Sequence, residues 1–242
     1  MTLVLAHARA SVQELGRYPG YVVPTLLFPA MFFVFFGSSA RGYVATLGMC
    51  SFAAFAVIGV AFFQFGVGIA LERGSPWETL LRTLPVSPLE RILARLVCGG
   101  LFAAGSAAIV VGTALALTDA GLDAAQWLEL TLALLCSIVP FGLLGIALGY
   151  WATAKSALPI ANVLYLGLAY AGGLWVRPAG LPEAVDRLSP YLPTRHVANI
   201  LAGVVRGSPW RVGDWLALAG FALAFAVLAV VGYRRDEARR FR

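Results

Sequence analysis

Few residues of this sequence could do chemistry, and they lie far apart. The two histidines, His7 and His196, fall on opposite sides of the membrane in the topology predicted from the apolar runs, so they cannot share a metal ion. Cys50, Cys98 and Cys136 lie in three different apolar runs without metal-ligand spacing, and we interpret them as small apolar helix residues. The sequence contains no GxxxxGK[ST], HExxH or GxSxG motif. We therefore expect no catalytic residue, metal site or cofactor-binding site in this chain.

The composition predicts an integral membrane protein. Of the 242 residues, 60% are hydrophobic and only 12% are charged, whereas about a quarter of the residues in a soluble domain are charged. Because so few charges cannot coat a water-exposed surface, lipid must be part of the solvent. The basic residues lie at the ends of apolar runs rather than on one face, which disfavours nucleic-acid binding.

Six apolar runs predict an all-α protein with six transmembrane helices in a single transmembrane domain over residues 1–242. A perpendicular span needs about 20 residues, and Trp and Tyr mark several run ends, as interfacial aromatics do. The expected spans are 20–37, 43–71, 91–117, 127–153, 157–176 and 214–233. The first is the least secure, because Pro24 and Pro29 could indicate a bent or incomplete crossing.

The distribution of Lys and Arg predicts that both termini are cytoplasmic. With the N-terminus inside, twelve of the 18 basic residues fall on the inner side and six on the outer side. Residues 1–19 show an apolar stripe opposite charged residues, which predicts an amphipathic helix on the membrane surface. A frayed terminus is the alternative for this segment.

The cytoplasmic segment 72–90 contains two helix starts of the same kind. Residues 75–78 read Ser-Pro-Trp-Glu and residues 87–90 read Ser-Pro-Leu-Glu, which is the pattern of a capping box with proline at the first helical position. Pro85 ends the first helix after about two turns. The sequence thus predicts a short amphipathic helix between spans two and three. It either rests on lipid headgroups or protrudes as a rigid element that a cytoplasmic partner binds.

The extracytoplasmic segment 177–213 has two further helical patterns, separated by Ser189-Pro190 and Leu192-Pro193, and Gly207 is a plausible C-terminal stop. This segment is too long for a bare connection. We expect a helical hairpin that folds back toward the outer leaflet, with a flat position on the lipid as the alternative.

The spans are nearly free of polar residues. Gln64 is the main exception, and a helix–helix hydrogen bond is its favoured interpretation over a substrate contact. Carriers driven by protons or sodium usually hold ionisable groups at mid-membrane, so their scarcity argues against a self-sufficient carrier.

These patterns resemble the permease subunits of the ABC-2 type exporter family, which includes drug- and antibiotic-export permeases. The inner stretch from Glu72 to Ser87 resembles that family's "E…G…L..LPVS" motif between spans two and three. The outer stretch from Leu188 to His196, with Gly207 after it, is similar to the family's "SP.LPT.H……G" motif before the last span. The resemblance covers essentially the whole chain.

The resemblance implies a non-enzymatic permease in a prokaryotic cell (cytoplasmic) membrane, crossing it several times. Its partners would be a separate ATP-binding cassette subunit, which holds the ATP and magnesium, and a second permease copy in a homodimer or heterodimer. The implied ATPase-coupling residues are Glu72, Arg73, Gly74, Trp77, Glu78, Leu80, Leu81, Arg82, Leu84 and Pro85. The implied outer-gate residues are Leu188, Pro190, Pro193, Arg195, His196, Val197 and Ile200.

Apolar spans without buried charge favour a lipophilic or amphipathic substrate, such as a drug, natural product, lipid or glycolipid. Two other functions stay open: a self-sufficient membrane carrier or channel, and a membrane scaffold subunit that transports nothing.

Overall fold

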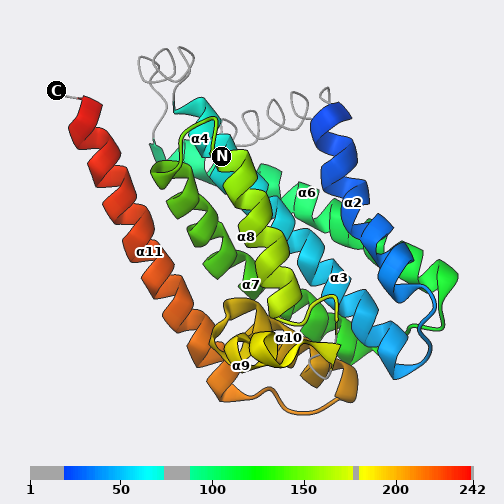
Figure 1. Ribbon diagram of the computed structural model, residues 1–242. Coiled ribbons are helices and arrows are strands. Elements are labelled where there is room, and N and C mark those ends of the chain that lie inside the picture. Colours follow the sequence, from blue (N-terminus) through cyan, green and yellow to red (C-terminus); the bar gives the residue numbers. More distant parts are fainter. Residues whose placement is uncertain (1–18, 74–87, 177–179, 241–242) are drawn as a thin grey trace.

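A computed structural model describes residues 19–73, 88–176 and 180–240. These residues are helical and contain no strand, which confirms the all-α prediction (Figure 1). In chain order the helices are α2 (Pro19–Gly37), α3 (Tyr43–Ala61), the π-helix η1 (Phe62–Val67), α4 (Gly68–Glu72), α6 (Pro88–Leu117), α7 (Ala124–Trp151), α8 (Ala157–Ala171), α9 (Glu183–Leu188), the 3-10 helix η3 (Ser189–Tyr191), α10 (Pro193–Arg206) and α11 (Val212–Arg240).

Among the described residues, four helices are long and apolar enough to cross a membrane: Tyr43–Glu72, Leu96–Leu117, Ala124–Trp151 and Val212–Ala238. They confirm a membrane protein. Two further apolar helices, Thr25–Gly37 and Ala157–Ala171, are shorter. The 15 residues of α8 rise only about 22 Å, less than the roughly 30 Å hydrocarbon core. The count of six spans therefore stays a prediction.

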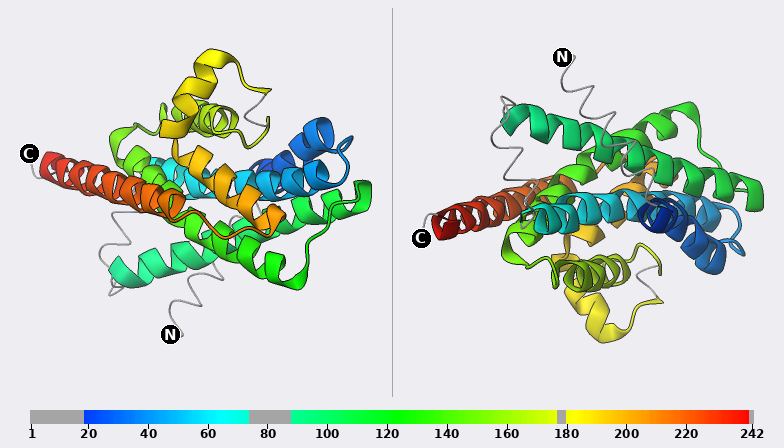
Figure 2. Two further views of the ribbon diagram at one scale, coloured as in Figure 1. Left: turned by 90° about the horizontal axis from the view of Figure 1, so that it is seen from below. Right: turned by 90° about the horizontal axis from the view of Figure 1, so that it is seen from above.

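Helix α3 is the centre of the bundle. Its residues from Met49 to Ala61 are all buried, and it packs against α2, α6, α7, α8 and α10. Figure 2 shows α6 on one side of α3 and α8 on the other, with α11 along a flank. Aromatic rings fill the space beside α3: Phe55 stacks on Tyr165 at 4.3 Å between ring centroids, and Trp175 meets Phe55 edge-on at 5.2 Å. The Tyr165 hydroxyl donates to the Phe55 carbonyl at 3.0 Å.

The helix ends separate into two groups at opposite ends of the bundle (Figure 1). The C-terminal ends of α4, α7 and α11 lie together at one end of the bundle. The α2–α3 and α6–α7 connections lie at the other, together with α9 and α10. We call the first of these the inner end and the second the outer end, after the predicted topology; the side of the membrane on which each lies stays a prediction.

The π-helix packs against α7 at glycines. A Cβ atom on Gly145 would lie 2.7 Å from the Ala61 carbonyl oxygen, and one on Gly149 would lie 2.9 Å from the Gly66 carbonyl oxygen. Because backbone atoms cannot rotate out of the way, only glycine permits this approach. The second predicted span is therefore held closely to α7 at the turn where its hydrogen-bonding pattern changes.

Gly145→Ala is expected to lower the free energy of unfolding by about 1–2 kcal/mol, because the added methyl group forces α7 away from α3. Gly142→Ala on the same helix is the matched control, since its Cβ would lie 3.6 Å from the Phe65 ring, an ordinary contact distance. Thermal unfolding in detergent measures both. Equal midpoints for the two variants would show that the close approach is not needed.

Candidate functional site

The predicted inner segment begins at the end of α4, and the structure describes only its ends. Glu72 is the last residue of α4 and Arg73 follows it, while α6 begins at Pro88, as the second capping pattern predicted. The other predicted coupling residues lie outside the described residues, as do residues 1–18 of the surface helix predicted over 1–19. They are Gly74, Trp77, Glu78, Leu80, Leu81, Arg82, Leu84 and Pro85.

Arg73 joins three helices at the inner end of the bundle. Its Nη1 atom lies 2.6 Å from Asp236 Oδ1 on α11 and donates to the Tyr150 carbonyl of α7 at 3.0 Å. Its Nη2 atom donates to the Ala152 carbonyl at 2.8 Å. The last carbonyls of a helix have no partner within the helix, so a guanidinium group at this position both satisfies them and neutralises their partial charge. The Arg73 and Asp236 side chains are about four-fifths buried.

Aromatic contacts extend this joint along α7 and α11. The indole of Trp151 donates to the Leu228 carbonyl at 3.0 Å, and the Arg235 guanidinium lies over the same ring at 5.2 Å. Gly232 permits the approach, because a Cβ there would lie 2.7 Å from the indole nitrogen. The start of the inner segment is therefore bonded to α7, and α7 is packed closely on the last long helix.

Sequence reasoning missed this joint. Arg73 was expected to contact the ATPase, and nothing in its local sequence indicates a partner 163 residues away. The structure places its guanidinium inside the bundle end. An ATPase-contact role for Arg73 and its neighbours stays a prediction.

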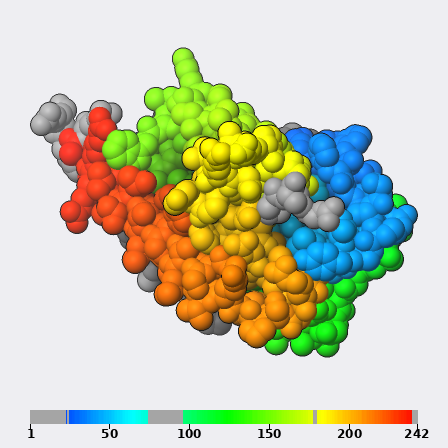
Figure 3. Space-filling model, turned by 60° about the horizontal axis from the view of Figure 1, so that its bottom comes forward, coloured from blue at the N-terminus to red at the C-terminus, as the bar shows by residue number. Residues whose placement is uncertain are grey.

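The predicted outer segment contains two short helices, α9 and α10, joined by η3. Pro193, Val197 and Ile200 are buried, Arg195 and His196 are half-buried, and Leu188 and Pro190 are exposed. Figure 3 shows this segment covering the outer end of the molecule between α11 and the α2–α3 pair. Five of the seven predicted gate residues thus pack at least partly against the bundle. Their role as a gate stays a prediction.

Hydrogen bonds connect α10 to α8 and to α7. Thr194 Oγ1 donates to the Leu168 carbonyl of α8 at 2.6 Å. Gln126 Nε2, in the first turn of α7, donates to the Val204 carbonyl at 3.0 Å and to the Val205 carbonyl at 3.3 Å. Gly207 ends α10 in the left-handed conformation with φ of 62°, as its position in the sequence predicted.

A carboxylate joins α10 to the last long helix. Asp214, in the first turn of α11, is buried. Its Oδ1 atom lies 2.8 Å from His196 Nδ1 and accepts a hydrogen bond from Asn199 Nδ2 at 3.0 Å. Arg195 donates to the Ser189 hydroxyl at 3.2 Å. His196 therefore makes a structural contact between α10 and α11, which its sequence position alone did not indicate.

Gln126→Glu is expected to loosen the end of α10. Glutamate still accepts from the Asp123 amide in the capping box, but it cannot donate to the two α10 carbonyls, and its negative charge faces them. The loss of such hydrogen bonds costs about 1–3 kcal/mol. Hydrogen exchange should increase across residues 200–207. Asp123→Ala, which removes the cap of α7 alone, should leave exchange in α10 unchanged; an equal increase in both variants would contradict this assignment.

A small cavity lies beside the contacts between α6 and the second predicted span. Gln64 Nε2 lies 3.9 Å from Cys98 Sγ on α6, which is consistent with the helix–helix contact favoured from the sequence. A cavity between α3 and α6, lined in part by Val57, Phe65 and Leu96, has a volume of about 40 Å³. Ligand pockets usually measure about 300–1,000 Å³. This cavity is therefore too small to hold a drug-sized substrate.

A family profile described as "ABC-2 family transporter protein" matches residues 25–231. The chain belongs to this family. The match spans both the inner segment and the outer segment, from within α2 to the second half of α11. It confirms the resemblance that the two sequence stretches indicated.

A similar protein occurs in Bacillus subtilis (strain 168). It is named putative transport permease YvfS and is 24% identical over 245 residues, covering 98% of this chain and 100% of the relative. The ABC-2 family protein described here is thus comparable to this relative over its full length. Family membership and the apolar helices agree on a membrane protein of the transport permease class.

Proposed function

We propose that this ABC-2 family protein is the permease subunit of an ATP-driven exporter, and that it moves a lipophilic or amphipathic substrate out of the cytoplasm or the inner leaflet. The observation that carries the proposal is the joint at Arg73. It links the start of the inner segment to α7 and α11 through one ion pair and two hydrogen bonds. A force applied to residues 74–87 would thus pass directly into the spans.

The energy source lies in a partner. ABC-2 family permeases generally work with a separate ATP-binding subunit. In this proposal that subunit holds the ATP and magnesium, the residues from Glu72 to Pro85 bind it, and the permease itself catalyses nothing. The inner segment then acts as a coupling helix rather than a helix resting on headgroups.

A second permease copy completes the transport pathway. The described interior of one chain is occupied by aromatic rings around Phe55, and the cavity beside α3 holds only about 40 Å³. A substrate of drug size therefore needs a path along the surface of the bundle, between two permeases. The outer segment would close that path, because α10 is fastened to α7, α8 and α11 by hydrogen bonds at the outer end. The substrate class rests on the apolar character of the long helices.

Deletion of residues 77–84 is expected to abolish co-purification with the ATP-binding subunit encoded nearest to this chain. Reversal of charge at both Glu78 and Arg82 should weaken binding about tenfold or more, because interface charge pairs contribute strongly when desolvated. Co-expression and affinity purification of the full chain measure both variants. Arg187→Gln, on the exposed surface of α9, is the control and should bind normally.

The same complex in liposomes distinguishes the other functions. ATP-dependent substrate movement supports the exporter. Flux by the permease alone without ATP would establish a self-sufficient carrier or channel. Stable binding of the ATPase without any substrate movement would favour a scaffold subunit.

A further inference from the structure

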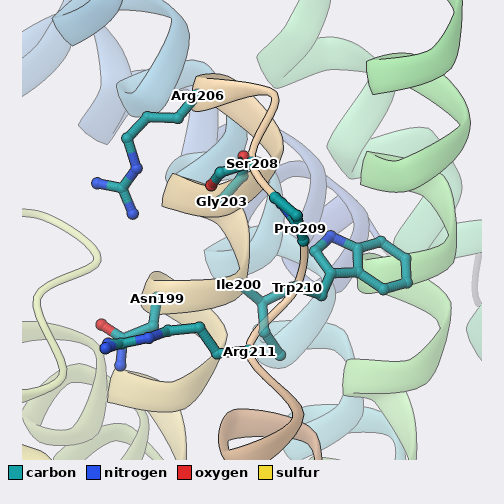
Figure 4. A pocket seen from close by; sticks show the side chains of 8 residues that line it. All are labelled: Asn199, Ile200, Gly203, Arg206, Ser208, Pro209, Trp210 and Arg211. Atoms are coloured by element: carbon teal, nitrogen blue, oxygen red, sulfur yellow. Dashed lines mark hydrogen bonds between the residues drawn. The ribbon is translucent and has the colours of Figure 1, made fainter.

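A cavity of about 250 Å³ opens at the outer end, between α10 and the loop that leads into α11. Figure 4 shows its lining, which includes Asn199 and Arg206 of α10 and Ser208 and Arg211 of the loop. The Arg211 side chain runs beside Asn199 in this view. The volume is slightly below the range of drug-sized pockets, so it suits a small polar group rather than a whole substrate.

The lining is cationic. It contains two guanidinium groups and no carboxylate. The nearest carboxylate bonded to a lining residue is Asp214, which already accepts from Asn199 and contacts His196. The Arg206 and Arg211 side chains are exposed, so their charges face solvent rather than being held by the protein interior. Arginine binds phosphate oxygens well because its planar group donates several hydrogen bonds.

The helix ends at the cavity also favour an anion. The negative end of α10 is covered, because its last carbonyls accept from Gln126, from the Gly207 amide and from the Ser208 amide. The positive end of α11 begins at Val212, directly after Arg211, and the buried Asp214 in its first turn already neutralises part of it. The loop between them is held in place by Trp210 and Trp215, whose rings lie 5.1 Å apart. The charged groups are therefore presented on an anchored loop.

An apolar track leads away from the cavity along α11. Val212, Leu216, Leu223 and Val227 are each more than 60% exposed. At 100° per residue they fall within a stripe about 60° wide on one face of the helix. The stripe starts beside Arg211 and runs toward the centre of a long apolar helix. A ligand with a charged head and hydrocarbon chains matches both features, whereas free phosphate would use only the first.

We propose that this cavity binds the phosphate headgroup of an anionic phospholipid in the outer leaflet, with its acyl chains along the exposed face of α11. The bound lipid would bridge α10 and α11 and so hold the outer segment against the last long helix. This inference is independent of the transport function proposed above, because it concerns binding to the permease alone.

Native mass spectrometry of the full chain in detergent tests the proposal, with short-chain phosphatidylglycerol, short-chain phosphatidylcholine and inorganic phosphate as probes. Arg206→Gln together with Arg211→Gln is expected to weaken phosphatidylglycerol binding at least about tenfold, because each charge-assisted hydrogen bond contributes strongly. The matched control is Arg41→Gln together with Arg187→Gln, which removes the same charge from the outer side away from the cavity. The control should bind as the unmodified chain does.

A second variant leaves both arginines in place. Gly203→Val narrows the cavity, since Gly203 lines it and a Cβ at this position would lie 3.8 Å from Ser208 and from the Trp210 ring. It should also lose phosphatidylglycerol. Equal loss in the control and in the arginine variant, or unchanged binding in the arginine and Gly203 variants, would overturn the site. If inorganic phosphate bound as tightly as phosphatidylglycerol, the assignment to a lipid would be overturned. If phosphatidylcholine bound as tightly as phosphatidylglycerol, the preference for an anionic headgroup would be overturned.

Discussion

Arg73→Gln is expected to abolish ATP-driven transport while the ATP-binding subunit stays attached. The substitution removes the ion pair with Asp236 and weakens the bonds to the Tyr150 and Ala152 carbonyls. Breaking an ion pair that is about four-fifths buried costs about 2–4 kcal/mol, because two largely desolvated charges lose their mutual attraction. The inner segment would then be bound by the ATPase at one side but released from α7 and α11 at the other.

Two measurements separate coupling from binding for this variant. Co-purification reports attachment of the ATPase, and ATP-dependent flux in liposomes reports coupling. Asp236→Asn is the graded comparison, because it removes the charge of the partner but leaves both carbonyl bonds of Arg73, and it should retain part of the flux. If Arg73→Gln instead loses the ATPase while thermal unfolding shows an intact fold, Arg73 contacts the ATPase directly rather than connecting the inner segment to α7 and α11.

Gly172→Ala is expected to force the outer segment away from α8 and to lower the free energy of unfolding by about 3 kcal/mol. An added Cβ would lie 2.1 Å from Thr194 Oγ1, 2.4 Å from Thr194 Cβ and 2.8 Å from the Thr194 carbonyl carbon. A rotation of the Thr194 side chain relieves only the first of these contacts. The bond from Thr194 to the Leu168 carbonyl would be lost as α10 moves.

Gly167→Ala on the same helix is the matched control for this variant. It meets no atom within 4 Å and replaces a glycine in the helix interior, so it should be neutral or stabilising by up to about 1 kcal/mol. Thermal unfolding and protease resistance of residues 189–206 measure the two variants. Comparable protease resistance in both would show that α10 is not seated on Gly172.

The fold class and the long apolar helices were predictable, because a membrane imposes length and apolarity on each crossing helix. The start of α6 at Pro88 and the end of α10 at Gly207 were predictable too, since capping residues act over a few positions. The extent of the predicted fifth span, 157–176, stays a prediction: α8 ends at Ala171, and Gly173 follows in a left-handed conformation with φ of 83°.

The contacts that join the candidate functional regions were not predictable from one sequence. Arg73 meets Asp236 and Gln126 meets Val204 across 163 and 78 residues. Each residue looks ordinary in its own segment, as a charge near a span end or a polar residue in a first helical turn. Their partners are set by the packing of α7 against α10 and α11, which a single sequence does not encode in any local pattern.

The π-helix within the second predicted span has a consequence for the phase of that span. A π-helix closes its hydrogen bonds to the fifth residue along rather than the fourth, so it inserts one additional residue into the helical repeat. Every side chain after Val67 is therefore displaced by about one residue's rotation, roughly 100°, relative to an uninterrupted α-helix. Without that insertion, the Arg73 side chain would point in a different direction around the helix axis and would not face both α7 and α11. Removal of one residue between Phe62 and Val67 would thus reorient the inner end of the span while leaving its composition nearly the same.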